Sequence, residues 1–181
     1  MKIQSVRFGE IDVGANAVIH FPAGIAPFGK KLDFVVLAGG EKHPNSLVSL
    51  PYQGMEENPQ AYVGCRLEKD ESEMLGGQEL AWLQSLQFPQ LGFWVGHAGK
   101  LFPDRDIGIE AHHLQSVHIE RMEQLCIVLI LTIEAKQVTA NLLAPVLVNT
   151  EAGIGRQVVV AAGVEQVRVP VPACRVTLQA I

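Results

Sequence analysis

The 181-residue sequence has no long hydrophobic run and no excess of basic residues. Its most apolar stretch, residues 125–133, is far shorter than the ~18–20 residues that a membrane helix requires. The first residues contain no apolar segment of signal-peptide length. We therefore expect a cytoplasmic protein that does not bind membranes. The formal net charge of −5 argues against direct nucleic-acid binding by phosphate neutralisation, and suits a partner protein that is basic.

Cysteine is scarce, and its spacing matches no redox or metal motif. Cys65, Cys126 and Cys174 lie far apart in the chain, and their number is odd. This pattern predicts three reduced thiols rather than a disulfide framework. Cys126 lies inside the most apolar run, so we expect it to be a small hydrophobic residue of the core.

Motifs for catalysis and cofactor binding are missing as well. The stretch Gly96-His97-Ala98-Gly99-Lys100 lacks the leading glycine of a phosphate-binding loop, and Leu101 follows where a Mg²⁺-binding Ser or Thr is required. The stretch Gly153-Ile154-Gly155 lacks the third glycine of a dinucleotide fingerprint and predicts a hairpin turn. No nucleophile elbow is present. We therefore predict a binding module that is not an enzyme and that uses no cofactor and no metal.

One histidine cluster supports an alternative. His112, His113 and His118 lie close in sequence, with Glu110 and Glu120 nearby. On a helix, His113 and His118 are five positions apart and do not share a face as an i,i+4 pair would. The simpler interpretation is a polar helix start at the surface. A small metal-dependent enzyme that uses these three histidines remains the alternative.

The clearest structural signal is a pair of apolar runs, residues 125–133 and 138–149, joined by Glu134-Ala135-Lys136-Gln137. Two strand-length runs with a short polar connection predict a β-hairpin. Both runs are too apolar for a sheet with one wet face, so we expect them at the centre of the core. Pro145 cannot donate a ladder hydrogen bond and should interrupt the second strand. We expect Asn141 to brace the backbone kink beside this proline.

The remaining elements predict an all-β, single-domain, antiparallel β-barrel-like or sandwich fold with one or two short helices. The domain covers 1–181, with an inserted hairpin or loop segment at about 41–78. Phe28 should point into the core, residues 96–100 should form a loop, and residues 112–122 are the best helix candidate. Further strands are expected at residues 2–8, 18–21, 34–37, 80–86, 91–95, 156–161 and 167–171.

Taken in order, several motifs together resemble the FliW family of bacterial flagellar assembly factors. They are Arg7-Phe8-Gly9-Glu10-Ile11, Phe21-Pro22-Ala23-Gly24-Ile25 with Phe28, Trp82-Leu83-Gln84-Ser85-Leu86, Pro89 with Leu91 and Phe93, Phe102-Pro103-Asp104, residues 141–149, residues 155–159 and residues 167–170. The chain departs from the family pattern in three places. The 41–78 segment is long, Gln87-Phe88 replaces an acidic pair, and Arg105 stands where an aromatic residue is common.

The resemblance implies a compact β-barrel-like fold without catalysis. It implies two protein partners, flagellin and the RNA-binding translational regulator CsrA. CsrA represses the translation of flagellin, and a chaperone-like factor of this family relieves that repression. A divergent paralogue with a different protein partner is a second alternative. The long apolar motif predicts that Leu142, Leu143, Val146 and Val148 belong to the core. The candidate partner-binding residues, expected to be exposed in or near turns, are Gln84, Phe102, Pro103, Asp104 and Asn149.

Overall fold

The computed structural model describes residues 1–14, 17–29, 31–38, 80–134, 137–161 and 163–172. The inserted segment expected at 41–78, and with it Cys65, lies outside the described residues, as does Cys174. The strands are β1 (Lys2–Ser5), β2 (Gly9–Asp12), β3 (Val18–Phe21), β4 (Leu32–Ala38), β5 (Leu80–Ser85), β6 (Gly92–His97), β7 (Leu125–Glu134), β8 (Gln137–Ala140), β9 (Val146–Asn149), β10 (Ile154–Gln157) and β11 (Val169–Pro170). The helical segments are α2 (Ala98–Leu101), α3 (Ala111–Gln115) and the 3₁₀ turns η3 (Met122–Gln124) and η4 (Val164–Arg168).

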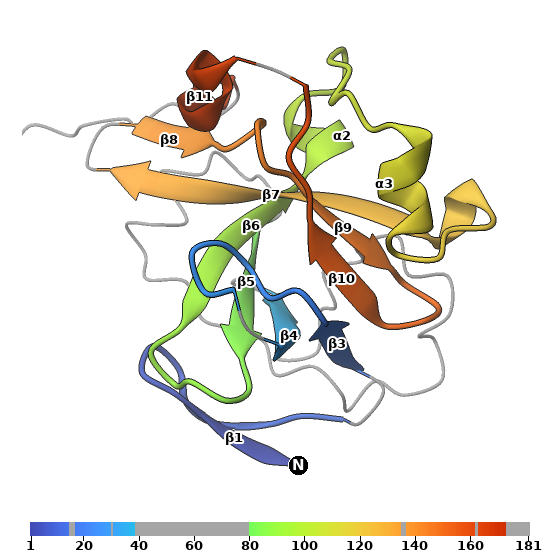
Figure 1. The fold of residues 1–181 in the computed structure, drawn as a ribbon. Coiled ribbons are helices and arrows are strands. Elements are labelled where there is room, and N and C mark those ends of the chain that lie inside the picture. Colours follow the sequence, from blue (N-terminus) through green and yellow to red (C-terminus); the bar gives the residue numbers. More distant parts are fainter. Residues whose placement is uncertain (15–16, 30, 39–79, 135–136, 162, 173–181) are drawn as a thin grey trace, which may run out of the picture.

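Seven strands close into a barrel (Figure 1). The order β7-β6-β5-β4-β3-β10-β9 returns to β7, because the first half of β7 pairs with β9 and the following residues pair with β6. Every neighbouring pair is antiparallel except β10 and β3, which are parallel and joined at Ile154 and His20. The next backbone donor on that side of β3 would be Pro22, which has no N–H, so this pairing ends there. The predicted all-β, barrel-like fold is confirmed.

The two apolar runs lie at the centre of the fold, as predicted. Cys126 and Val128 of β7 belong to the buried cluster inside the barrel, whereas Leu129 and Leu131 pack outward against α2. Both faces of β7 are therefore covered, which explains its nearly continuous hydrophobic sequence. On β10, Gly155 faces the ring of Phe21, and a Cβ atom there would overlap that ring. The missing side chain leaves the barrel room for a fully buried phenylalanine.

Pro145 divides the second apolar run into two strands. β8 ends at Ala140 and β9 begins at Val146, and both pair with β7. Between them, the Oδ1 of Asn141 accepts a hydrogen bond from the backbone N–H of Ala144 at 3.0 Å. The expected hairpin, the interruption at the proline and the bracing role of Asn141 are all confirmed. Leu142, Val146 and Val148 are buried, and Leu143 is partly buried.

A second, two-stranded sheet covers part of the barrel wall. β1 and β2 form a hairpin whose Ile3, Ile11 and Val13 pack against Val35 and Leu37 of β4. The guanidinium group of Arg7, in the turn of this hairpin, lies 5.1 Å and 4.8 Å from the ring centroids of Trp82 and Trp94. These cation–π contacts add to the apolar burial that attaches the hairpin to the barrel.

Three local predictions were wrong. Phe28 is 44% exposed rather than buried, because its loop carries it past the edge of the core. Residues 98–101 form helix α2 instead of a loop, since Ala98 and Leu101, three positions apart, both bury against the barrel wall. The helix expected at 112–122 is only Ala111–Gln115, and His118 has a φ of 56°, a left-handed conformation that a helix cannot continue through.

The last two predicted strands differ in extent. β10 begins at Ile154 and ends at Gln157, earlier than the expected 156–161. Residues 164–168, part of which we expected to be strand, form the 3₁₀ turn η4, and only Val169–Pro170 pairs as β11. Within the described ranges, no helix combines the length and the apolar content needed to cross a membrane.

Candidate partner-binding surface

Gln84, near the end of β5, is buried beneath the turn between β5 and β6. Its side chain is 1% exposed. The Oε1 atom accepts a hydrogen bond from the indole N–H of Trp82 at 3.0 Å. The Nε2 atom donates to the carbonyl oxygens of Leu91 at 3.0 Å and Ser85 at 3.1 Å. The expectation that Gln84 is exposed was wrong, since its amide is held inside by hydrogen bonds to the indole of Trp82 and to carbonyl groups of the turn.

Asn149 is buried for the same physical reason. Its side chain is 2% exposed. The Nδ2 atom donates to the carbonyl oxygens of Val117 and His118 at 3.0 Å and 2.9 Å. The Oδ1 atom accepts from the N–H groups of Glu151 and Ala152 at 3.1 Å and 2.9 Å. The amide thus joins the segment after α3 to the β9–β10 turn, and the expectation that Asn149 is exposed was also wrong.

The Phe102-Pro103-Asp104 motif has one buried residue and two exposed residues. Phe102 is 6% exposed, packs with Leu101 and Leu129, and its N–H caps α2 by donating to the carbonyl of Ala98 at 2.8 Å. The expected exposure of Phe102 was therefore wrong, because the ring completes the apolar cluster outside the barrel. Pro103 and Asp104 are exposed. Their role in partner binding remains a prediction.

The 102–106 loop meets the C-terminal 3₁₀ turn η4. The Nη2 of Arg105 donates to the Oε1 of Gln166 at 2.8 Å, and the Arg105 guanidinium lies 6.0 Å from the Phe102 ring centroid. The carbonyl of Gln166 accepts a hydrogen bond from the N–H of Leu142 at 2.8 Å. Three motifs that are distant in sequence, at 102–104, 141–149 and 167–170, therefore meet at one end of the molecule.

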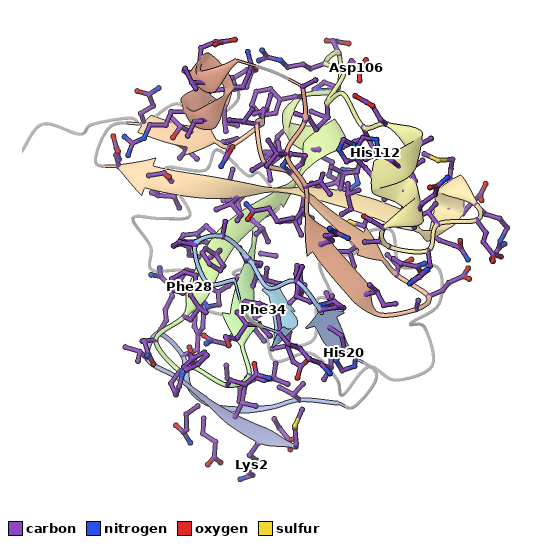
Figure 2. All side chains as sticks on the ribbon, viewed as in Figure 1. Lys2, His20, Phe28, Phe34, Asp106 and His112 are labelled. Carbon is purple, nitrogen blue, oxygen red and sulfur yellow. The ribbon has the colours of Figure 1, made fainter. Side chains whose placement is uncertain are left out.

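We call the exposed part of this assembly the carboxylate surface. Val164 and Val167 are 83% and 39% exposed and share one side of η4, because a 3₁₀ helix has three residues per turn. Asp106 lies at the top of the view in Figure 2. The surface consists of the exposed residues Pro103, Asp104, Asp106, Val164, Glu165 and Val167.

Negative charge predominates on the carboxylate surface. Among the described residues, Asp104, Asp106 and Glu165 take part in no salt bridge. Two arginines lie nearby, and among the described residues only the charge of Arg168 is compensated by an ion pair; Arg105 keeps its charge, so three carboxylates outnumber one cation. Arg105 binds the neutral amide of Gln166, and Arg168 pairs with Glu134 at 2.8 Å. Unpaired carboxylates beside exposed valines suit a partner surface that is both basic and partly apolar.

The histidines of the sequence-based alternative do not converge. His113 is buried, and its Nδ1 is 3.1 Å from the backbone N of Glu110, which donates to it. The ring of His112 stacks on His113 with centroids 3.9 Å apart, and His118 lies beyond the end of α3. Within the described part of the chain, no three His, Cys, Asp or Glu side chains are grouped so that they could hold a metal ion.

Two other groups have altered ionisation for reasons of burial. Burial raises the pKa of the Cys126 thiol to about 12, so this thiol stays protonated and unreactive at neutral pH. Burial, followed by the charge of Lys100, lowers the pKa of His97 below its usual value. The buried Nδ1 of His97, directly before α2, has no hydrogen-bond partner.

Sequence reasoning missed the part of the surface that η4 contributes. Val164, Gln166 and Val167 were not candidates, because a valine-rich segment near a chain end favours a strand. The useful signal was the spacing of three between Val164 and Val167, with polar residues between them. Arg105 was noted as a departure from the family pattern, but its bond to Gln166 depends on a residue 61 positions away.

Comparisons with known proteins agree on one family. The sequence model of the family described as "FliW protein" matches residues 67–171. The flagellar assembly factor FliW of Syntrophomonas wolfei is 28% identical over 159 residues, which is 87% of this chain and 80% of that protein. The flagellar assembly factor FliW of Heliobacterium modesticaldum is 29% identical over 161 residues, or 88% and 82% of the two chains. A crystal structure of the flagellar assembly factor FliW shares the fold, with a TM-score of 0.65, 21% identity and complete coverage of both chains.

Proposed function

The chain belongs to the FliW family of non-enzymatic flagellar assembly factors, and from this premise we propose that it binds both flagellin and the translational regulator CsrA. When this protein binds CsrA, the repression of flagellin translation is relieved. When it binds flagellin instead, CsrA is released and can bind the flagellin mRNA again. Such an exchange requires that the two partners do not bind at the same time and that the affinities of the two complexes differ.

The observation that carries the proposal for CsrA is the carboxylate surface. An RNA-binding protein presents basic side chains to phosphate. Asp104, Asp106 and Glu165 offer unpaired negative charge to such side chains, while Val164 and Val167 offer apolar contact. The whole chain carries a net charge of −5. A protein of this charge, docked beside an RNA-binding site, repels phosphate and weakens RNA binding even without covering the site.

The proposal is tested by titrating the protein with purified CsrA and, separately, with monomeric flagellin. The informative variant is Asp104→Lys/Asp106→Lys. Its matched control is Glu120→Lys/Glu123→Lys, which makes the same change of net charge at two exposed positions that form no salt bridge with the described residues. We expect the first variant to weaken CsrA binding by about tenfold or more, and the control to change it by less than about threefold.

Salt supplies a second readout. The affinity of the unaltered protein for CsrA should fall as ionic strength rises, because exposed charges are screened over about 10 Å at 0.1 M salt. If the unaltered protein binds neither partner, the proposed function is wrong. If it binds both and the Asp104→Lys/Asp106→Lys variant behaves like the control, the carboxylate surface is not the CsrA site.

A further inference from the structure

Three apolar side chains are exposed in the part of the molecule that holds the β1–β2 hairpin and the β5–β6 turn. Figure 1 shows β1 at the end away from β8 and β11, and Phe28 is labelled in Figure 2. Val6 is 78% exposed, Phe28 is 44% exposed and Phe88 is 42% exposed. The backbone N–H of Val6 donates to the carbonyl of Pro89 at 2.9 Å, which places the β1–β2 turn beside Phe88. We call Val6, Phe28 and Phe88 the aromatic surface. Large exposed apolar groups that gather in one region mark interaction sites more often than scattered ones do.

The Phe28 ring is connected to the barrel core by a series of aromatic contacts. Phe28 lies 6.3 Å from Phe93, measured between ring centroids. Phe93 lies 6.2 Å from Phe34, and Phe34 lies 5.1 Å from Phe21. The last two rings are fully buried. Phe28 is therefore held in place before any partner arrives, which lowers the entropic cost of binding.

The Phe88 turn is held just as firmly. Buried Gln84 binds carbonyl groups of the turn from inside. From outside, the Nε2 of Gln87 donates to the Oδ2 of Asp33 at 2.7 Å, and its Oε1 accepts from the N–H of Asp33 at 3.0 Å. The side-chain amides of Gln84 and Gln87 therefore both form hydrogen bonds that hold the turn carrying Phe88.

Backbone pairing with a partner strand is not available at this turn. The N–H groups of Ser85, Leu86 and Leu91 donate to the carbonyls of Leu91, Asp33 and Phe88. Those of Gln87 and Phe88 donate to the hydroxyl of Ser85. Strand addition requires free main-chain donors and acceptors. A partner must therefore bind here through side chains, as the apolar face of a helix does.

Cations lie close in sequence to the aromatic surface: Arg7 follows Val6, and Lys31 comes three residues after Phe28. The β5–β6 turn, residues 86–90, contains no ionisable side chain. Around it, His20 contacts Asp33 at 2.7 Å and Lys2 contacts Glu10 at 2.6 Å. These cations repel a basic partner, whereas the uncharged turn can be covered by an apolar face without removing water from a charged group.

We propose that the aromatic surface binds the apolar face of an amphipathic helix in a partner protein, at a site separate from the carboxylate surface. This inference rests on the proposed function for the identity of the partner. Of the two proposed partners, the carboxylate surface suits CsrA, so the helix belongs to flagellin.

The test is the affinity for monomeric flagellin of the variant Phe28→Ser/Phe88→Ser. Its matched control is Met122→Ser/Val159→Ser, which removes two apolar side chains of 63% and 71% exposure outside both surfaces. We expect at least about a 30-fold loss of flagellin affinity for the first variant, since aromatic anchors dominate interfaces, and less than about a threefold loss for the control. Both variants should retain wild-type affinity for CsrA and should stay folded, as shown by a cooperative thermal unfolding transition.

Two results overturn the inference while leaving the proposed function intact. One is a Phe28→Ser/Phe88→Ser variant that binds flagellin as tightly as the control does. The other comes from alanine scanning of the flagellin segment that is protected in the complex. Losses at positions i, i+3 or i+4 and i+7 support a helix, whereas losses at alternate residues indicate an extended chain. If the unaltered protein binds no flagellin at all, both the inference and the proposed function are wrong.

Discussion

The aromatic surface and the carboxylate surface differ in the polar contacts that hold them in place. Behind the aromatic surface, Gln84 is 1% exposed, and its amide binds turn carbonyls from inside the protein. At the carboxylate surface, the 102–106 loop is joined to η4 by Arg105 and Gln166, whose 2.8 Å hydrogen bond is exposed. The aromatic surface therefore rests on buried hydrogen bonds of Gln84, whereas the polar contact between the 102–106 loop and η4 is exposed to solvent.

The difference teaches how firmly each surface is preorganised. An exposed hydrogen bond competes with water and contributes on the order of 0.5–1 kcal/mol. Removal of the buried Gln84 amide takes donors from carbonyls, and an acceptor from the Trp82 indole, in a low dielectric, which costs considerably more. We therefore expect the aromatic surface to keep one shape before and after binding, and the carboxylate surface to adjust to its partner.

The largest expected effect comes from the anchor of the carboxylate surface. Phe102→Ala removes a ring that is 6% exposed in the apolar cluster outside the barrel, and should lower the free energy of unfolding by about 4 kcal/mol. The neighbouring Pro103→Ala serves as the control, since Pro103 is exposed; it should change stability by no more than about 0.5 kcal/mol. Urea unfolding measures both. A Phe102→Ala loss below about 1 kcal/mol would mean that this loop is not anchored as described.

The next effect tests the brace behind the aromatic surface. Gln84→Leu preserves side-chain size but leaves the carbonyls of Ser85 and Leu91 without this donor, so we expect a loss of about 3 kcal/mol. Gln90→Leu in the same turn is the matched control, because Gln90 is exposed. Amide hydrogen exchange should show faster exchange across residues 85–91 in the first variant alone. Equal exchange in the two variants would contradict the bracing role of Gln84.

The smallest expected effect is a pH response at one end of the molecule. The pKa of His97 is lowered by burial and then by Lys100, so below about pH 6.5 the unfolded chain binds a proton that the folded chain resists. The free energy of unfolding should therefore fall as the pH drops below 6.5 toward the folded pKa. Hydrogen exchange at pH 5.5 and 7.5 should locate the loss of protection in α2, whereas the β5–β6 turn, which has no ionisable side chain, should not respond.

The matched control for this response is His97→Gln, which cannot take up the proton. In that variant, the difference in stability between the two pH values should become smaller. A response of the same size in His97→Gln would assign the pH dependence to other groups.

Most of the strands could be predicted from sequence because their causes are local. Val18–Phe21 was predicted with its observed bounds, and the division of the 138–149 run at Pro145 followed from a missing backbone donor. The short helices were harder to predict, because α2 is stabilised by the packing of Ala98 and Leu101 against the barrel wall. Propensity over four residues carries too little free energy to predict such a segment.

The candidate site was only partly predictable. The motif at 102–104 led to Pro103 and Asp104, which are exposed, yet the same reasoning placed Gln84 and Asn149 at the surface, where they are not. A polar residue near a turn is exposed or buried according to which carbonyl groups surround it. For Asn149, two of those carbonyls, from Val117 and His118, come from more than 30 residues away.

Local sequence patterns thus account for where the chain is extended, where it turns and which strands are apolar on both faces. Alternation of side chains and the missing N–H of proline act over a few residues and need no knowledge of the rest of the molecule. Closure of the seven-strand barrel, the contact of the 102–106 loop with η4, and the burial of Gln84 and Asn149 arise only in three dimensions. Each depends on atoms that are distant in sequence, and an amide is stable in the interior only when folding brings those atoms within hydrogen-bond distance.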